Sequence, residues 1–383
     1  MVDKEFLMIP GPTPLPPRVM AAMTHPMVNH RGILFKKLFG ESRDILKKML
    51  NISGDVFLIP SSGTGAMELA VQNFTHRGER VLVVDTGFFG ERFYKINVAF
   101  GRNAIHLEIP WGKGATPEAV KEAVRNDPTI KAVFLTQNET SSTVLNNIRE
   151  ISSAIREISD AFIIVDAVSS IGIAEIDMDN WGIDVVAAAS QKGLMSPPGI
   201  GIVAANKRAV DFALSSDNDS YYFNLKDLKK NADLGQPFTT FPVADFFGFR
   251  EGLNILLEEG FENTYKRHEA YRTLVRDALK ELNLKFVADD AVASPAVTGI
   301  YAPEGVNADE IVSMMRKYSV EIASGQGILK GKAFRIGHMG FINSNDLLVT
   351  VGALECVLKD LKYEFEFGSA VKKLLSVRRS LNV

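Results

Sequence analysis

Lys192 and Asp166 are the two residues whose types and positions are most suited to chemistry. Lys192 follows an apolar run at 185–189 and precedes a turn that is rich in glycine and proline. Asp166 ends a second apolar run, which begins at residue 161. Burial beside a core strand lowers the pKa of a lysine amine and makes it a nucleophile toward a carbonyl carbon. Taken alone, each residue also fits a plain structural role, because most lysines are solvated at the surface.

The positions of these two residues predict that their side chains meet. Ligands of α/β sheets bind at the carboxyl ends of parallel strands, and both residues stand at the end of a strand-like run. A lysine that forms a Schiff base and an aspartate that faces a pyridinium nitrogen are the minimal signature of pyridoxal phosphate (PLP) chemistry. The sequence therefore predicts a PLP site in which Lys192 and Asp166 are the catalytic residues.

The elements that must position these residues alternate between strands and helices. Strands are predicted at 56–60, 80–85, 104–110, 131–136, 161–166 and 200–205, and helices at 17–23, 34–50, 116–125 and 148–159. This spacing is typical of parallel βαβ units, so we expect a mostly parallel, seven-stranded type of sheet wound by helices on both faces. After residue 285 the pattern becomes strands at 286–288 and 297–302 and helices at 308–318 and 345–361, a smaller α+β domain.

The length of 383 residues exceeds one ordinary core, so more than one domain is expected. We place an extended, proline-rich arm at 1–20, a large PLP-binding domain at 21–258 and a small C-terminal domain at 259–383. A long helix at 249–282 is expected to connect the domains. The polar and aromatic stretch at 215–245 is expected to be a functional or interface loop, because long loops without their own structure are uncommon in compact domains.

Composition excludes several classes of protein. The net charge of −3 gives no basic stripe, so neither nucleic acid nor an anionic membrane is expected as a partner. The sequence contains no apolar run of bilayer-spanning length. A single cysteine, Cys356, excludes an internal disulfide framework and fits a reducing cytoplasm. We expect no metal site.

Two motifs carry a resemblance to a known family. Ser190-Gln-Lys with the Pro-Pro-Gly that follows it, and Val165-Asp-Ala-Val-Ser-Ser, resemble the class V aminotransferases of the alanine–glyoxylate and serine–pyruvate type, which have PLP fold type I. The resemblance extends from Gly11 to about Leu361, and its motifs are specific in combination. It implies transamination by a ping-pong scheme and a homodimer with shared active sites.

The resemblance also implies roles for individual residues. Gly63 lies in a strand–turn–helix segment, whose free backbone N–H groups suit an anion. Arg335 alternates with apolar residues on a predicted strand, where a charge is costly unless it is paired. In the family's pattern, the cofactor would be held by Ser62, Gly63, Thr64, Phe89, Thr140, Val168, Gln191 and Thr240. The substrate would be held by Gly11 and Arg335. Thr240 would act on the partner subunit's phosphate, although Pro237 replaces the tyrosine often found three residues before it.

Several functions remain open from the sequence. We expect serine or alanine as amino donor and pyruvate or glyoxylate as acceptor, because Arg335 accounts for one carboxylate. An aspartate- or phosphoserine-type aminotransferase using 2-oxoglutarate needs a second cation, for which His30-Arg31 is the candidate. A desulfurase or lyase of this fold needs a cysteine on a mobile loop, whereas Cys356 lies in a predicted helix. A catalytically idle protein of this fold would commonly lack the lysine or the aspartate.

Overall fold

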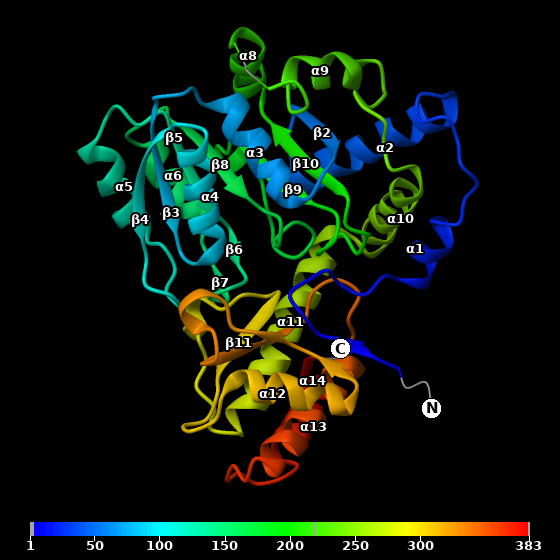
Figure 1. The fold of residues 1–383 in the computed structure, drawn as a ribbon, viewed down its shortest axis with the longest axis vertical. Coiled ribbons are helices and arrows are strands. Elements are labelled where there is room, and N and C mark those ends of the chain that lie inside the picture. The colour runs from blue at the N-terminus through cyan, green and yellow to red at the C-terminus, as the bar shows by residue number, and fades with distance from the viewer. Residues whose placement is uncertain (1–3, 218–219, 382–383) are drawn as a thin grey trace.

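A seven-stranded sheet forms the centre of the larger part of the protein (Figure 1). The computed structural model describes residues 4–217 and 220–381. In spatial order the strands are β2 (Asp55–Pro60), β10 (Ile200–Ala205), β9 (Val185–Ala189), β8 (Phe162–Asp166), β5 (Ala132–Thr136), β3 (Arg80–Asp85) and β4 (Asn103–Glu108). Strand β10 is antiparallel to both of its neighbours, and the other pairs are parallel. The expected mostly parallel α/β sheet is confirmed.

Helices cover both faces of this sheet, so its inner strands read as continuous apolar runs. One face packs against α2 (Ile33–Leu50), α5 (Pro117–Asn126), α6 (Ile148–Arg156) and α10 (Val243–Glu259). The other packs against α3 (Gly63–Phe74), α4 (Phe88–Ala99), α8 (Lys207–Ser215) and α9 (Leu225–Asp233). Side chains of a strand alternate between faces, and on β9 Val186 joins the first core while Val185 joins the second.

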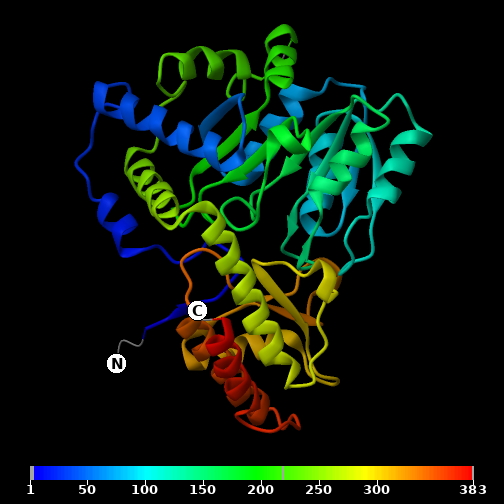
Figure 2. The same cartoon turned by 180° about the vertical axis from the view of Figure 1, so that it is seen from behind.

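The smaller part of the protein lies below the larger part in Figure 2. It has a hydrophobic core of its own. Its sheet is antiparallel, in the order β11 (Val297–Tyr301), β14 (Ala333–Gly337) and β13 (Ala323–Ser324). Its helices are α11 (Phe261–Lys280), α12 (Ala308–Met315), α13 (Ser344–Asp360) and α14 (Ser369–Leu381). Within the described ranges, no helix is long and apolar enough to cross a membrane.

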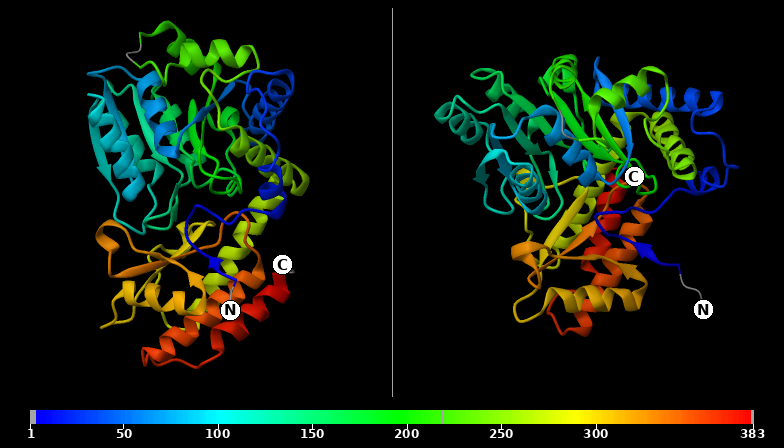
Figure 3. Two further views of the ribbon diagram at one scale, coloured as in Figure 1. Left: turned by 45° about the vertical axis from the view of Figure 1, so that its right-hand side comes forward. Right: turned by 45° about the horizontal axis from the view of Figure 1, so that its top comes forward.

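The N-terminal arm lies between the two parts of the protein (Figure 3). Its strand β1 (Phe6–Leu7) pairs with β12 (Val320–Glu321) of the smaller part. The carbonyl of Met8 accepts a hydrogen bond of 2.7 Å from the Gly337 amide, and the Thr13 amide donates one of 3.1 Å to the Gln191 carbonyl. The arm then enters α1 (Pro17–Ala22), which packs on α10. Both the smaller sheet and the turn that carries Lys192 are therefore tied to the arm.

Short elements complete the chain. They are the hairpin strands β6 (Asn138–Glu139) and β7 (Val144–Leu145), helix α7 (Met178–Trp181), and the 3-10 turns Asp290–Val292, Arg316–Tyr318 and Gly327–Leu329. The hairpin follows the carboxyl end of β5, so it stands at the edge of the sheet where ligands of such folds bind.

Three sequence predictions need correction. The helix expected at 249–282 is two helices, because Gly260 (φ 83°, ψ 129°) has a backbone conformation that ends α10 and favours glycine. The stretch at 215–245 contains α9, whose first turn is capped by Asn224, and the start of α10; residues 218 and 219 lie outside the described residues. The strand expected at 286–288 is an isolated bridge between Phe286 and Ile300. Helix α14 was not predicted.

Candidate active site

Lys192 lies in the turn that joins β9 to β10, at the carboxyl end of β9. The turn is closed by a hydrogen bond of 3.0 Å from the Ser190 amide to the Ile200 carbonyl. The Lys192 ammonium nitrogen donates to the carbonyl of Pro10 in the arm. Burial and the positive charge of Arg335 lower the pKa of Lys192 to about 8, although Asp166 acts in the opposite direction. The ammonium form therefore still dominates at neutral pH, but far more neutral amine is present than for an exposed lysine.

Asp166 is the last residue of β8, the strand next to β9. Its side chain is 4% exposed, and its Oδ1 atom accepts a hydrogen bond of 2.9 Å from the Val168 amide. No other described residue donates a hydrogen bond to this carboxylate. Burial raises the pKa of Asp166 to about 7, and the nearby charge of Glu139 acts in the same direction. A buried carboxylate with one donor is a suitable partner for a cationic ligand group.

The start of helix α3 provides backbone donors beside Asp166. Ser62 precedes the helix and makes no side-chain capping hydrogen bond. A Cβ atom on Gly63 would lie 2.6 Å from a methyl carbon of Val168, so only glycine allows the helix to begin this close to the end of β8. The Thr64 hydroxyl accepts a hydrogen bond of 3.2 Å from Arg92. Amide N–H groups at a helix N-terminus favour an anion such as a phosphate.

Phe89 is held at the start of α4 by a buried carboxylate, that of Glu139. This carboxylate accepts hydrogen bonds from the amides of Phe89 (2.9 Å), Gly90 (3.1 Å) and Ser141 (3.0 Å), and from the Ser141 hydroxyl (2.6 Å). The Arg92 guanidinium carbon lies 4.8 Å from the centre of the Phe89 ring. Glu139 and Arg92 were not predicted as site residues. The available signals were that Glu139 precedes Thr140 and that Arg92 lies three residues after Phe89 on a helix.

The arm, the large sheet and the small sheet enclose one cavity of about 290 Å³. Among the predicted residues, its lining includes Gly11, Phe89, Thr140, Lys192 and Arg335. A Cβ atom on Gly11 (φ +94°) would lie 2.4 Å from the Lys192 side chain, so this position requires glycine. The structure thus brings together residues that are up to 324 positions apart in the sequence.

Arg335 lies on β14, the central strand of the small sheet, and its side chain is 6% exposed. Its guanidinium donates to the Ser324 carbonyl through Nε (3.0 Å) and Nη2 (2.9 Å), and to the Thr140 carbonyl through Nη1 (2.9 Å). Burial lowers the pKa of Arg335 to about 10, so it stays protonated at neutral pH. The charge of Arg335 on this inner strand is therefore stabilised by hydrogen bonds to backbone carbonyls of both parts of the protein.

The other predicted residues do not line this cavity; Ser62, Gly63, Thr64, Asp166 and Val168 stand at the start of α3 and the end of β8. Gln191 contributes its carbonyl to the arm, and its buried side-chain oxygen has no hydrogen-bond partner among the described residues. Thr240 is exposed and does not line the cavity. Arg31 is also exposed, and its guanidinium donates to the Phe238 carbonyl at 2.9 Å. Neither Thr240 nor Arg31 reaches the site of its own chain.

The side chains at this edge of the sheet fit PLP. A nucleophilic lysine and a buried acid with a free oxygen stand on neighbouring strands, and Gly63 leaves room at the helix terminus that a Cβ atom would fill. The unpartnered side-chain oxygen of Gln191 supplies a further acceptor beside Lys192. These groups match the aldehyde, ring nitrogen and phosphate of the cofactor.

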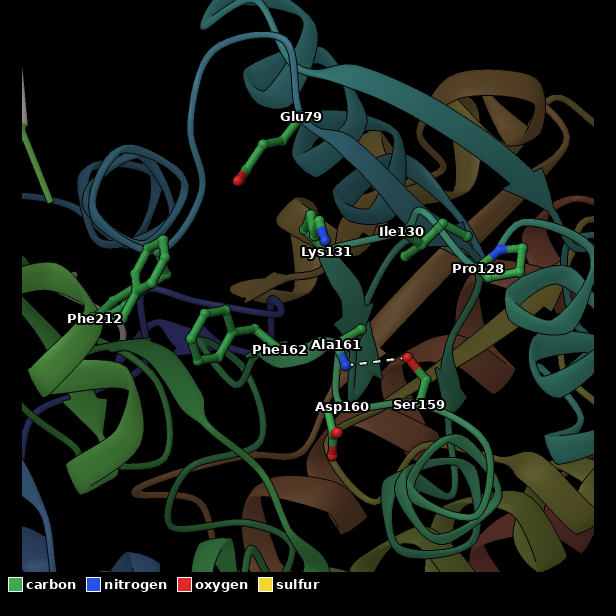
Figure 4. Close-up of a pocket in the computed structure, with 10 residues that line it drawn as sticks. Glu79, Pro128, Ile130, Lys131, Ser159, Asp160, Ala161, Phe162 and Phe212 are labelled. Atoms are coloured by element: carbon green, nitrogen blue, oxygen red, sulfur yellow. Dashed lines mark hydrogen bonds between the residues drawn. The ribbon is translucent and has the colours of Figure 1, made fainter.

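A second hollow, of about 260 Å³, lies at the opposite edge of the sheet (Figure 4). It is lined by Phe74, Glu79, Pro128, Ile130, Lys131, Ser159, Asp160, Ala161, Phe162 and Phe212. Lys131 and Ala161 directly precede β5 and β8, so this hollow stands at the amino ends of the strands. It contains none of the predicted site residues, and we assign the chemistry to the carboxyl edge.

Comparison with known proteins agrees with this geometry. The class-V aminotransferase family profile matches residues 6–341. The chain is 39% identical to the soluble hydrogenase 42 kDa subunit of Anabaena cylindrica, covering 97% of this chain and 98% of that protein. It is 37% identical to serine–glyoxylate aminotransferase of Methylorubrum extorquens, covering 98% and 96%. The solved structure of ureidoglycine–glyoxylate aminotransferase from Bacillus subtilis superimposes with a TM-score of 0.93 at 28% identity, over 99% of both chains. This protein, a PLP-dependent transferase of fold type I, therefore belongs to the class-V aminotransferase family.

Proposed function

We propose that this aminotransferase moves the amino group of serine or alanine to glyoxylate or pyruvate. The observation that supports small, monocarboxylic substrates is the charge inventory of the 290 Å³ cavity. Apart from Lys192, its cations are Arg335 and Arg316. Arg316 is paired with Glu321 through two hydrogen bonds of 2.7 and 2.8 Å, so it is already neutralised. One carboxylate can bind to Arg335, and a second would lack a free cation.

The chain's own residues would divide the reaction among themselves. PLP supplies an electron sink for the negative charge that develops when the substrate α-carbon loses its proton. The Lys192 amine first holds the cofactor and then accepts and returns that proton. The Asp166 carboxylate keeps the ring nitrogen protonated, and the α3 N-terminus at Ser62, Gly63 and Thr64 binds the phosphate. Phe89 would stack on the ring, with Val168, Gln191 and Thr140 around it.

Arg335 would fix the α-carboxylate of the substrate within reach of Lys192, with Gly11 forming the opposite wall. A guanidinium suits this purpose because its planar N–H groups match both oxygens of a carboxylate. The two substrates of a ping-pong reaction are an amino acid and an oxo acid, and both carry this carboxylate. One binding position therefore serves both halves of the reaction.

A half-reaction assay tests this proposal. The purified protein should show the visible absorbance of bound PLP, which should disappear on addition of L-serine or L-alanine and return with glyoxylate or pyruvate. L-aspartate and 2-oxoglutarate should be poor substrates by kcat/KM. A preference for aspartate and 2-oxoglutarate would contradict the assignment to small monocarboxylic partners.

We also propose a homodimer in which each subunit completes the site of the other. The motivation is that Thr240 is exposed two residues after Phe238, which contacts Arg31 and the Tyr221 ring, and that these segments carry several exposed apolar side chains. These are Met27, Ile33, Leu34, Tyr221 and Leu234, of which Ile33 is 91% exposed. Exposed apolar groups of this size are typical of a subunit interface.

Subunit mixing tests the shared site. A hybrid of Lys192→Ala and Thr240→Ala subunits contains one site with both residues intact if Thr240 acts across the interface. Partial recovery of activity in the hybrid is expected, whereas mixing either variant with itself should recover nothing. A fully active monomer at high dilution would contradict the proposal.

A further inference from the structure

Almost every hydrogen-bond donor of Arg335 is already occupied within the chain. A guanidinium has five N–H groups. Nε and one N–H of Nη2 donate to the Ser324 carbonyl, and one N–H of Nη1 donates to the Thr140 carbonyl. The second N–H of Nη1 donates to the side-chain oxygen of Gln326 at 3.2 Å. One N–H of Nη2 is left for a ligand.

This arrangement conflicts with bidentate binding of a carboxylate. A carboxylate pairs with a guanidinium through two parallel N–H groups. The edge formed by Nε and Nη2 faces the Ser324 carbonyl, which is part of strand β13. Both N–H groups of Nη1 are occupied, by the Thr140 carbonyl and by Gln326, so the edge formed by Nη1 and Nη2 has one free N–H. A carboxylate can bind to this edge with both oxygens only if one of the two acceptors on Nη1 gives way.

Gln326 differs from the other acceptors because it is a side chain on a short connection. It lies between β13 and β14, directly before the turn Gly327–Leu329, and it lines the cavity. Gly325 precedes it and Gly327 (φ +53°) follows it. Ile328, next in the same turn, is 60% exposed. Rotation of the Gln326 side chain therefore requires no change in either strand, unlike displacement of the Ser324 or Thr140 carbonyl.

We propose that Gln326 closes the carboxylate position on Arg335 in the substrate-free enzyme and is displaced by the substrate carboxylate. This inference rests on the proposed role of Arg335 in binding substrate. A neutral amide oxygen binds a guanidinium more weakly than a carboxylate does, so the substrate wins the exchange. In the empty enzyme the amide satisfies a buried N–H group that would otherwise lack a partner. An amine without a carboxylate cannot make the exchange, so Gln326 favours amino and oxo acids over simple amines.

Calorimetric titration with propionate tests the proposal in the PLP-loaded enzyme. Propionate has one carboxylate and no amine, so it binds without reacting. Gln326→Met removes the competing acceptor at similar size and should lower the Kd of propionate about 2- to 10-fold, the amount expected from one net hydrogen bond. Gln326→Glu should raise this Kd about 10-fold or more at pH 8, because a fixed carboxylate then pairs with Arg335. Ile328→Ala, in the same turn, is the matched control and should leave it unchanged.

Steady-state kinetics provide a second measurement. The KM values for amino donor and oxo-acid acceptor should fall by similar factors in Gln326→Met, because both substrates displace the same amide. If Gln326→Met weakens propionate binding or leaves it unchanged, Gln326 does not occupy the position and the inference is wrong. If Arg335→Lys binds propionate as well as the wild type, the error lies instead in the role proposed for Arg335. The two failures are thus distinguished.

Discussion

Two buried aspartates stand at opposite edges of the central sheet and have opposite surroundings. Asp184 directly precedes β9, at the amino edge, and is 1% exposed, whereas Asp166 ends β8, at the carboxyl edge, and is 4% exposed. Asp184 accepts hydrogen bonds from the guanidinium groups of Arg156 and Arg208. It also accepts from the Asn206 side chain (2.8 Å) and the Ile163 amide (2.7 Å). Asp166 accepts one hydrogen bond, from the Val168 amide.

The difference separates a structural acid from a functional one. Burial of a carboxylate is unfavourable unless charges and hydrogen bonds compensate it, and at the amino edge the chain supplies that compensation itself. At the carboxyl edge the chain leaves the acid under-compensated, and burial raises the pKa of Asp166 to about 7. A buried acid with a perturbed pKa that interacts with a lysine at the same sheet edge is a mark of a functional site. The charged groups at the two edges differ in the same way. In the amino-edge hollow, the charged side chains of Lys131 and Asp160 are exposed to solvent, whereas Asp166 at the carboxyl edge is buried (Figure 4).

The largest expected effect concerns the lysines at the two edges. Lys192→Ala should lower kcat by about 10³-fold or more, because it removes the group that moves the proton. Lys131→Ala, at the amino edge, should keep wild-type activity. Borohydride treatment followed by peptide mass spectrometry should find the cofactor attached to Lys192 in the wild type. Attachment to another lysine would remove Lys192 from this role.

The aspartates should differ almost as strongly in catalysis. Asp166→Asn should still bind PLP but lower kcat by about 10²- to 10⁴-fold, because the ring nitrogen loses its negative partner. Asp184→Asn should keep kcat near the wild-type value for the folded enzyme. Steady-state assays at 25 °C on both holoenzymes measure this contrast. Near-normal activity of Asp166→Asn would show that Asp166 has no catalytic role.

Stability should show the reverse order. Asp184→Asn should lower the free energy of unfolding by about 2–4 kcal/mol, because it disrupts a buried cluster of two arginines and a carboxylate. A larger loss, as seen when a fully buried ion pair is broken, is not expected because the Arg208 side chain is 44% exposed and its charge is partly screened by solvent. Urea unfolding of the cofactor-free protein at pH 8 provides the measurement. An unchanged midpoint would show that the cluster contributes little.

Asp166→Asn should instead stabilise the cofactor-free protein at pH 8. The pKa of Asp166 is raised from 3.8 to about 7, so between these values the folded state binds more protons than the unfolded state. Stability from this group is therefore lost as pH rises through that window, and the asparagine removes a penalty of about 2–4 kcal/mol above it. The gain should disappear near pH 4. Thermal melts of both proteins between pH 4 and 8 measure it, and a gain that is the same at all pH values would contradict the assignment.

The smallest effect is expected at Arg31. Its guanidinium donates a hydrogen bond to the Phe238 carbonyl of the same chain. Arg31 thus resembles Arg156 and Arg208, whose hydrogen bonds to Asp184 stabilise the fold and bind no ligand. Arg31→Ala should therefore change the ratio of the kcat/KM values for serine and aspartate less than about twofold, as is usual for surface substitutions away from a site. A selective rise in the KM of aspartate would assign Arg31 to substrate binding and restore the dicarboxylic alternative.

The sequence alone determined the features that neighbouring residues encode. The alternation of apolar strand-like runs with helical segments predicted a sheet covered by helices on both faces. The positions of Lys192 and Asp166 at the ends of such runs made them the candidate catalytic residues. Both predictions were possible because strand periodicity and βαβ spacing are local properties of the sequence. Gly260 shows the limit, since the helical pattern continues on both sides of the residue that ends α10.

Only the tertiary structure decided which groups meet across long sequence separations. The Pro10 carbonyl reaches Lys192, and Arg335 donates to the Thr140 carbonyl, because the arm and the small sheet close on the carboxyl edge of the large one. No periodicity records such contacts, which depend on how the two hydrophobic cores pack. The same holds for the aspartates: both read as an acid beside an apolar run, and only the fold supplied Asp184 with its arginines and left Asp166 with one amide.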